Sequence, residues 1–391
     1  MLQLTRRAAL LGLTAAFTLG RASLALAVAE TDRRFVVVIL RGALDGMSAV
    51  VPHGDPALAG LRGELVPDGL LDLGGFYGLH PSLSNLHHMY EAGELLPVHA
   101  VAGPTRVRSH FEAQDCLESG ADHRMSSGWL NRAVAAIPGA TNGRPEGDAM
   151  AIGVAVPLLL RGSARVGNWA PHGIVTPNLD LYTQIAALNE ADHVTGPAIA
   201  EGLRERGFTS EVLTDDSTEP AANRYAFPAL ARAGGEMLRA TDGPRIAALE
   251  IGGWDTHVAQ VPRLTRVLKD LDDGLAGLKQ GLGPAWQQTA VLVMTEFGRT
   301  ARVNGTKGTD HGTGTVAFVL GGAVAGGRVV ANWPGLRAGQ LLENRDLAPT
   351  TDLRSIAKGL LTHHLRLSPP ALDQVFPDSV TAPATQGLIR A

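Results

Sequence analysis

The stretch of sequence that decides the fold is RRFVVVILRGALDGMSAVVP, residues 33–52. Its apolar, mostly β-branched run from Phe35 to Leu40 is typical of a strand that is buried on both faces. Strands of this kind occur in parallel sheets that helices cover on each side. Asp45 and Gly46 follow the run, and this pair by itself is ordinary turn chemistry beyond the end of a strand.

Segments with strand and helix patterns continue along the chain. Apolar runs typical of strands occupy residues 96–103, 245–251, 288–300, 315–322 and 327–333. Helical patterns occupy residues 80–95, 109–120, 219–240, 261–282 and 350–365. The first of these helices is expected to begin at Ser82 or Ser84 and to end near Gly93, and the second is expected to end at Gly120. Strand followed by helix, repeated, predicts an α/β fold built from βα units.

The middle of the chain, residues 121–245, is less regular. Its Gly, Pro and Asn predict a loop at 138–148, and residues 149–162 resemble a strand or a hairpin. Pro228 is expected to kink the helix at 219–240, and the Pro-rich tail after Ser368 is expected to be irregular. We interpret residues 121–245 as a cap inserted on the substrate side of one main domain, residues 30–391.

Composition excludes several classes of protein. The 391 residues are 45% hydrophobic and 18% charged, with a formal net charge of -4, which is ordinary for a globular protein with a large core. Nothing is basic enough to predict binding to nucleic acid. Cys116 is the single cysteine, so the chain has no intrachain disulfide and no cysteine-based zinc site.

The first residues, 1–29, have the pattern of an export signal. Arg6 and Arg7 precede an apolar segment that ends in the small-residue site Ala25-Leu26-Ala27, which predicts the twin-arginine pathway and cleavage near Ala27 or Ala29. Arg21 interrupts the segment, which is shorter than the ~20 apolar residues that span a bilayer. We therefore expect a periplasmic or secreted protein that meets the twin-arginine translocase during export and keeps no permanent membrane span.

Polar side chains come directly after, or directly before, the buried runs. Ligands of open α/β sheets bind at the carboxyl ends of strands, so these positions are the candidates for a functional site. They are Asp45, Arg106, Arg108, Ser109, His110, Asp255, His257, Glu296, Arg299, Asp310 and His311.

Each of these residues alone has an ordinary structural explanation. Asp45 suits a turn, Ser109 suits a helix N-cap, and Arg299 suits a solvated surface. GGWDTHVAQ, residues 252–260, could be a polar turn. Together, however, the Asp, Glu and His residues supply the oxygen and nitrogen ligands of one or two divalent ions such as Zn, Mn or Mg. Two ions a few Å apart would clamp the attacking and leaving oxygens of a phosphoryl-like transfer.

The mature chain resembles the exported bacterial proteins grouped as DUF1501. The motifs that carry the resemblance, over roughly residues 33–365, are LRGALDGMSAVVP, HPSLSNL, RSHFEAQDCLESG, GGWDTH, TEFGRT and DHGTG. That family is similar to the alkaline phosphatase/sulfatase superfamily, and the similarity implies a three-layer α/β/α fold with a mostly parallel central sheet and bound divalent metal. DLAPTTDLRSIAKGL, residues 346–360, also looks like a late helix of sulfatases.

The resemblance implies a role for each matching residue. Ser109 would be the nucleophile, and the metal ligands would be Asp45, Asp255, His257, Glu296 and His311, with Asp310-His311 as an alternative Asp-His pair. Apart from the resemblance, we expect His110, Arg108 and Arg299 to take part in catalysis. Three departures qualify this pattern. The gap between Asp255 and His257 is tight, Phe297 stands where the superfamily has a metal His, and the formylglycine motif of sulfatases is missing at Ser109.

Two functions follow as hypotheses. The first is an exported metal-dependent hydrolase of phosphate or sulfate esters, carried by a small molecule or a polymer. Ser109 would attack the ester centre, and Arg108 or Arg299 would pair with the oxygens of the transition state. The second is a non-catalytic exported protein that keeps the fold for binding or assembly, and the departure at Phe297 motivates it.

Overall fold

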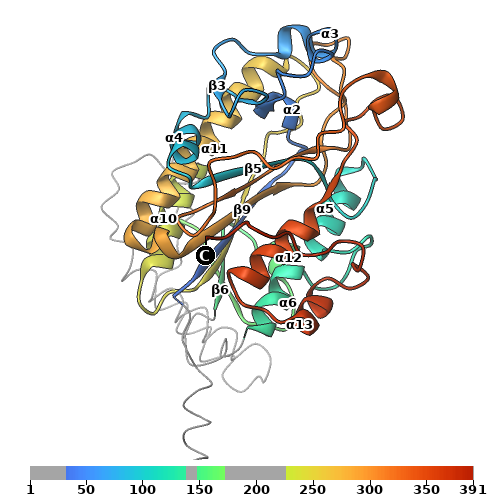
Figure 1. Ribbon diagram of the computed structural model, residues 1–391. Coiled ribbons are helices and arrows are strands. Elements are labelled where there is room, and N and C mark those ends of the chain that lie inside the picture. The colour runs from blue at the N-terminus through green and yellow to red at the C-terminus, as the bar shows by residue number, and fades with distance from the viewer. Residues whose placement is uncertain (1–31, 138–147, 172–225, 391) are drawn as a thin grey trace, which may run out of the picture.

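A single large sheet organises the protein (Figure 1). The computed structural model describes residues 32–137, 148–171 and 226–390, so the expected signal segment and most of the expected loop at 138–148 lie outside it. The strands run in the order β11-β5-β10-β9-β1-β8-β6-β7. Their bounds are β1 Arg34–Leu40, β5 Leu95–Ala102, β6 Ala149–Ile152, β7 Val166–Trp169, β8 Ile246–Ile251, β9 Thr289–Thr295, β10 Thr315–Leu320 and β11 Thr351–Asp352.

Strand direction confirms the mostly parallel α/β fold. β1 pairs in parallel with β8 on one side and with β9 on the other. β10 is the exception, because it runs antiparallel to both β5 and β9. A small second sheet, in the order β2-β4-β3, is formed by the short strands Val50–Val51, Gly78–Leu79 and Leu71–Asp72.

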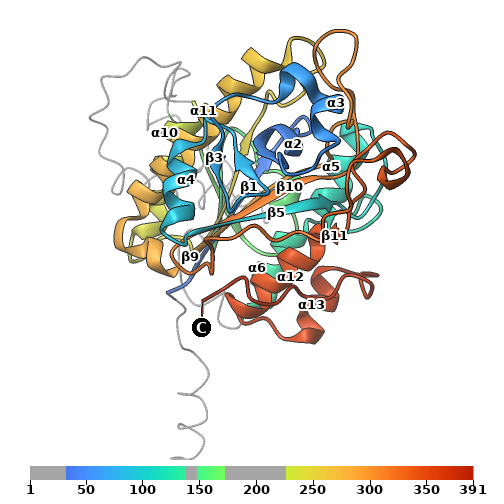
Figure 2. The ribbon, with the colours of Figure 1, turned by 45° about the horizontal axis from the view of Figure 1, so that its top comes forward.

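Helices cover both faces of the large sheet (Figures 1 and 2). One face carries α4 (Ser84–Glu91), α10 (Phe227–Arg239) and α11 (Gln260–Leu282). The other face carries α5 (His110–Ser119), α6 (Trp129–Ala136), α12 (Leu353–His363) and α13 (Pro369–Val375). The remaining short elements are α2 Gly46–Ala49, α3 Leu58–Arg62, and the 3-10 helices η1 Gly63–Leu65, η2 Leu158–Leu160, η3 Gly283–Gln288 and η4 Ala338–Gln340.

The β-branched run of β1 explains this layering. Val36, Val38 and Leu40 belong to the hydrophobic core under α4, α10 and α11. Phe35 and Val37 belong to the core under α6, α12 and α13. Successive side chains of a strand point to opposite faces, so a strand between two cores needs apolar residues at every position.

Three expectations drawn from the middle and the end of the chain need correction. Pro228 lies in the first turn of α10, where a missing N–H costs nothing, and it begins the helix instead of kinking it. Residues 327–333 form no strand; only Val330 bridges to Val98 of β5. Ser368 is the N-cap of α13, so the tail after it is not wholly irregular. Residues 149–162, expected to form a strand or a hairpin, form the strand β6 followed by the 3-10 helix η2, which confirms the strand, and β6 and β7 extend the large sheet.

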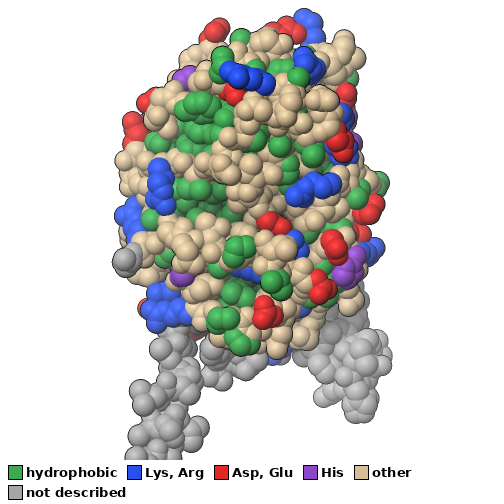
Figure 3. All heavy atoms as spheres, turned by 45° about the vertical axis from the view of Figure 1, so that its right-hand side comes forward, with side chains coloured by type: hydrophobic (Ala, Val, Ile, Leu, Met, Phe, Trp, Pro, Cys, Tyr) green, Lys and Arg blue, Asp and Glu red, His purple; other side chains and the backbone are tan. Residues whose placement is uncertain are grey.

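No helix within the three described ranges has the length and apolarity to cross a membrane. On the face shown in Figure 3, acidic and basic side chains are interspersed, and neither sign forms a continuous field. This face therefore has none of the clustered positive charge by which a nucleic-acid-binding surface is recognised.

Candidate metal centre

The sheet topology brings the candidate segments to one edge. β1, β5, β8 and β9 run in the same direction, so the segments that follow them leave the sheet at their shared carboxyl edge. β10 runs the other way, so the segment that precedes it reaches that same edge. His110 begins α5 after β5, Asp255 and His257 follow β8, Glu296 follows β9, and His311 precedes β10.

Three imidazoles surround one carboxylate oxygen at this edge. The Nε2 atoms of His257, His311 and His110 lie 3.0, 3.3 and 3.5 Å from Oδ1 of Asp255. The ligand atoms of His110, Asp255 and His311 lie within 4.8 Å of one another. His257 Nε2 is also 3.0 Å from His311 Nε2. We call these four residues the histidine cluster.

Each imidazole has an oxygen acceptor at its other nitrogen. Nδ1 of His110 donates to Glu296 Oε1 at 2.8 Å, and Nδ1 of His311 donates to the carbonyl oxygen of Arg108 at 2.9 Å. Nδ1 of His257 lies 3.2 Å from Asp310 Oδ1. A proton held on Nδ1 leaves the lone pair on Nε2, so all three rings present a metal-binding nitrogen to the same point.

These residues fit a divalent ion. Ligands at about 2.1 Å from a tetrahedral zinc would be separated by about 3.4 Å. Nε2 of His311 and of His110 lie 3.3 and 3.5 Å from Asp255 Oδ1, and the ligand atoms of these three residues all lie within 4.8 Å of one another. Nε2 of His110 is buried and has no hydrogen-bond partner among the described residues, which a bound ion would supply. Imidazoles with one carboxylate favour Zn or Mn over Mg.

Asp255 is kept ionised by a buried guanidinium. Nη2 of Arg299 lies 2.7 Å from Asp255 Oδ1, and the Arg299 side chain has no exposed surface, while Asp255 is 46% exposed. Burial alone would raise the pKa of Asp255, but the charge of Arg299, followed by that of His257, holds it below its usual value. Arg299 is thus paired with a candidate ligand and does not line the solvent-facing side of the site.

Glu296 is turned toward His110 and away from the centre of the cluster. It is buried, and its carboxylate accepts hydrogen bonds from the Gly42 N–H at 2.8 Å, from His110 and from Gln114 Nε2 at 2.9 Å. Burial would raise the pKa of Glu296, but the hydrogen bonds from His110 and Gln114 keep it lowered. Glu296 is therefore an ionised partner of a candidate ligand.

Asp45 lies in a separate buried network. Its Oδ2 accepts from Arg62, from Gln260 and, at 2.9 Å, from Ser48 Oγ. The side chains of Asp45 and Arg62 are both 1% exposed, so the pair is a buried salt bridge. Burial would raise the pKa of Asp45, but the charge of Arg62 holds it below its usual value. The structure does not bring Asp45 to the histidine cluster.

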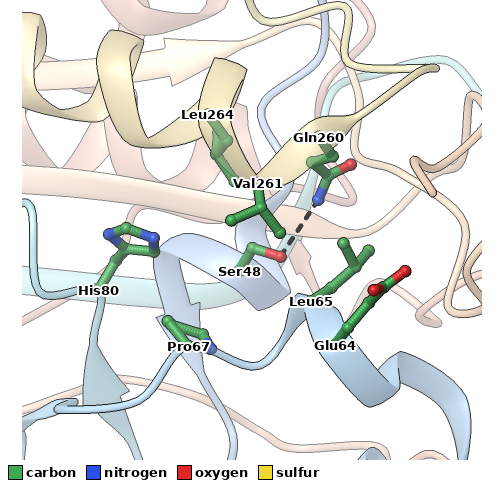
Figure 4. Close-up of a pocket in the computed structure, with 8 residues that line it drawn as sticks. All are labelled: Ser48, Glu64, Leu65, Pro67, His80, Gln260, Val261 and Leu264. Carbon is green, nitrogen blue, oxygen red and sulfur yellow. Dashed lines mark hydrogen bonds between the residues drawn. The ribbon is translucent and has the colours of Figure 1, made fainter.

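A small pocket adjoins the Asp45 network (Figure 4). Ser48 and Gln260, which hydrogen-bond to each other and to Asp45, form part of its wall. Its other lining residues are Glu64, Leu65, Pro67, His80, Val261 and Leu264. None of the four residues of the histidine cluster lines this pocket, and the cluster itself is partly open to solvent.

The two residues before His110 have different environments. The Arg108 guanidinium is bound by the buried Asp346, at 2.9 and 2.6 Å, and by Glu343 at 2.8 Å. It is therefore paired with acids instead of being free to meet a substrate. Ser109 is the exposed N-cap of α5, and its side chain makes no capping hydrogen bond.

Two residues acquire roles that the sequence analysis did not assign. Asp346 anchors Arg108, and its only sequence signal is its place at the start of DLAPT. Phe297, which directly follows Glu296, stacks on His110 with ring centroids 5.0 Å apart and packs against His311 at 5.1 Å. It forms an apolar wall that holds both rings in place.

Comparison with known proteins supplies a family. The sequence matches the family described as "Protein of unknown function (DUF1501)" over residues 94–376. No curated protein matches the chain.

Several solved structures share a weak likeness to this fold. A mutant of TAB5 alkaline phosphatase with Mg bound has a TM-score of 0.35 and 10% identity, covering 76% of this chain and 93% of that one. The phosphonate monoester hydrolase of Agrobacterium radiobacter has a TM-score of 0.35 and 12% identity, covering 76% and 70%. The C-terminal periplasmic domain of EcEptC from Escherichia coli, in complex with Zn, has a TM-score of 0.31 and 10% identity, covering 74% and 73%. At scores this low, the function must be inferred from the geometry of the site.

Proposed function

This chain belongs to the DUF1501 family, and from that premise we propose that it is a hydrolase of phosphate or sulfate esters that uses one divalent metal ion. The ligands are Asp255, His110 and His311, and the fourth position of the ion is left for water or the ester. His257 lies beside them, with its Nε2 3.0 Å from Asp255 Oδ1. The observation that carries the proposal is the convergence of three Nε2 atoms on Asp255 Oδ1, at 3.0 to 3.5 Å, with an oxygen acceptor behind every ring.

One ion is favoured over two by the position of Asp45. Its carboxylate lies in a separate network with Arg62, Ser48 and Gln260, and it does not belong to the group of side chains whose ligand atoms converge. Within the described residues, a single group of His and acidic side chains has ligand atoms close enough to hold an ion. When bound, the ion would polarise an ester oxygen and lower the pKa of a coordinated water.

Ser109 is the proposed nucleophile. The residues on both sides of Ser109 are held by the histidine cluster. The carbonyl oxygen of Arg108 accepts a hydrogen bond from His311, and His110 is itself a ligand. Its hydroxyl is exposed and makes no capping bond, so the first N–H groups of α5 remain available. Such groups bind anions, and they would hold the negative charge of a phosphate or sulfate beside the hydroxyl.

The neighbouring arginines act indirectly in this proposal. Arg299 keeps Asp255 ionised and in place, and Arg108 is fixed by Asp346 so that its carbonyl can orient His311. Neither guanidinium contacts the ester.

Hydrolysis of p-nitrophenyl phosphate and p-nitrophenyl sulfate by the mature protein, stripped of metal and reloaded with Zn or Mn, tests the proposal. We expect activity that needs the metal and is lost in Ser109→Ala. Ser368→Ala is the matched control, because Ser368 is also an exposed N-cap without a capping side-chain bond. Full activity in Ser109→Ala would remove Ser109 from the nucleophile role.

A metal-binding protein without catalysis is the second candidate. If His257 coordinates as well, four protein ligands would saturate a tetrahedral ion, as in structural zinc sites. Stoichiometric metal with no hydrolysis of either ester would favour this function.

Export by the twin-arginine pathway to the periplasm or the medium is part of the proposal. It is supported by Arg6, Arg7 and the apolar segment up to Ala27. Replacing both arginines by lysine is expected to keep the precursor in the cytoplasm, as fractionation and immunoblotting would show.

A further inference from the structure

We propose that Glu296 is a positioning residue that fixes the proton of His110 on Nδ1, and that it is not a ligand of the metal ion. The inference rests on the proposed metal site and is independent of whether the site hydrolyses an ester. It concerns the carboxylate that directly follows β9, which the sequence alone places among the ligands.

The oxygen of Glu296 that faces His110 has no capacity left for a metal. Its Oε1 accepts from the Gly42 N–H at 2.8 Å, from His110 Nδ1 at 2.8 Å and from Gln114 Nε2 at 2.9 Å. A carboxylate oxygen offers about two acceptor positions, so these three donors saturate Oε1. Oε2 lies 2.8 Å from Thr295 Oγ1, whose single proton can go to Oε2 or to the Leu40 carbonyl at 2.7 Å. Glu296 is not among the described residues whose ligand atoms converge on one point.

Groups from two elements hold Glu296 in this position. Gln114 lies one turn after His110 on α5, and its own Oε1 accepts from Arg41 Nη1 at 2.9 Å, so its amide group must face Glu296. Gly42 has a φ of 120°, and a Cβ there would lie 2.8 Å from the backbone nitrogen of Asp255. Only glycine lets this backbone N–H approach Glu296 while Asp255 stays in place.

The hydrogen bond from His110 to Glu296 determines which nitrogen of His110 can bind a metal. With the proton on Nδ1, its Nε2 carries the lone pair and faces Asp255 Oδ1 at 3.5 Å. No other acceptor for that Nδ1 proton exists among the described residues. The acceptor of His311 is a backbone carbonyl, which a substitution cannot remove, and the acceptor of His257 is the exposed Asp310. Substituting the buried Glu296 is therefore the way to test whether an acceptor orients a ligand.

The experiment compares Glu296→Ala with Glu296→Gln in the mature protein. Two quantities are measured: the His110 tautomer in metal-free, 15N-histidine-labelled protein by NMR at pH 8, and the zinc Kd by competition with a chromophoric chelator. Glu94→Ala is the matched control, because Glu94 is also a cation-paired carboxylate, bound to Lys279, but lies before β5 at the opposite edge of the sheet.

In Glu296→Ala we expect the Nδ1–H tautomer of His110 to be lost and zinc to bind about 10- to 100-fold more weakly, at an unchanged stoichiometry. In Glu296→Gln the amide oxygen still accepts from His110, so the tautomer is kept and the Kd stays within a few-fold of wild type. Glu94→Ala should change neither quantity. Glu296→Gln keeps the side-chain shape and remains decisive if Glu296→Ala does not fold.

Loss of zinc binding in Glu296→Gln with the Nδ1–H tautomer intact would overturn the inference, because it would identify Glu296 as a ligand. An unchanged tautomer and Kd in Glu296→Ala would overturn it as well. Failure of the proposed hydrolase is distinguishable, since both readouts are taken without any ester and the tautomer is measured without metal.

Discussion

Replacing Asp45 by Asn should destabilise the protein strongly without removing the metal. Asp45 and Arg62 are each 1% exposed, and in the variant Arg62 would keep only its bond to the Thr300 carbonyl, at 2.9 Å, as a strong partner. Removing one member of a buried ion pair typically costs about 3–5 kcal/mol, because the other charge stays buried without compensation. That is a large part of the total stability of a typical domain, about 5–15 kcal/mol.

The double variant separates the ion pair from other effects of the substitution. Asp45→Asn with Arg62→Met removes both charges, so its cost should fall below the sum of the single costs by about 2 kcal/mol, which lies within the range for groups in direct contact. Urea unfolding followed by circular dichroism gives the free energies, and elemental analysis of each variant gives its metal content. Metal content should be the same in all three variants and in wild type.

A different result would refute this reasoning. If Asp45→Asn costs less than about 1 kcal/mol and also lowers the metal content, Asp45 is a ligand and its pairing with Arg62 is incidental. Additive costs in the double variant would show that the two charges do not stabilise each other.

Three further predictions concern single residues. Asp272→Ala should cost about 1–3 kcal/mol, because this buried carboxylate of α11 accepts from the backbone N–H groups of Asn85 and Leu86 at the start of α4. Asp273, its neighbour, has an exposed side chain, so Asp273→Ala should cost little. Urea unfolding midpoints compare the two variants. Burial lowers the pKa of His99 to about 4, whereas its pKa in the unfolded chain is near 6.5. The free energy of unfolding should therefore be unaffected by His99 above pH 6.5 and should fall by up to about 3 kcal/mol as the pH falls toward 4, because only the unfolded state then binds the proton. A pH profile of stability that stays as steep in His99→Gln would contradict this. Arg299→Gln should weaken zinc binding about 10-fold or more by removing the charge beside Asp255, and an unchanged Kd from chelator competition would show that Arg299 does not support the site.

The β-branched run of β1 was enough to predict the sheet, because only a strand between two cores needs apolar side chains at every position. The rule that ligands gather at the carboxyl ends of parallel strands placed Asp255, His257 and Glu296 at one edge. The same rule led to His311 as a candidate, although the antiparallel direction of β10 could not be predicted from the sequence.

What the sequence could not supply was the pairing of charges. Nothing near Asp45 in the sequence shows that Arg62, on α3, folds back onto it, or that Glu296 faces His110 instead of an ion. These contacts join residues 17 and 186 positions apart. Pro228 was misjudged for a related reason, since its effect depends on where the helix begins, and propensity locates helix ends poorly.

The most direct test of the histidine cluster as a metal centre is the metal stoichiometry of the mature protein after dialysis against Zn or Mn, measured by elemental analysis for wild type, His311→Ala, Asp255→Ala and Asp45→Asn. We predict one equivalent in wild type and in Asp45→Asn, and a loss of most of the metal in His311→Ala and Asp255→Ala. No bound metal in wild type, or an undiminished equivalent in both cluster variants, would contradict the assignment of this site.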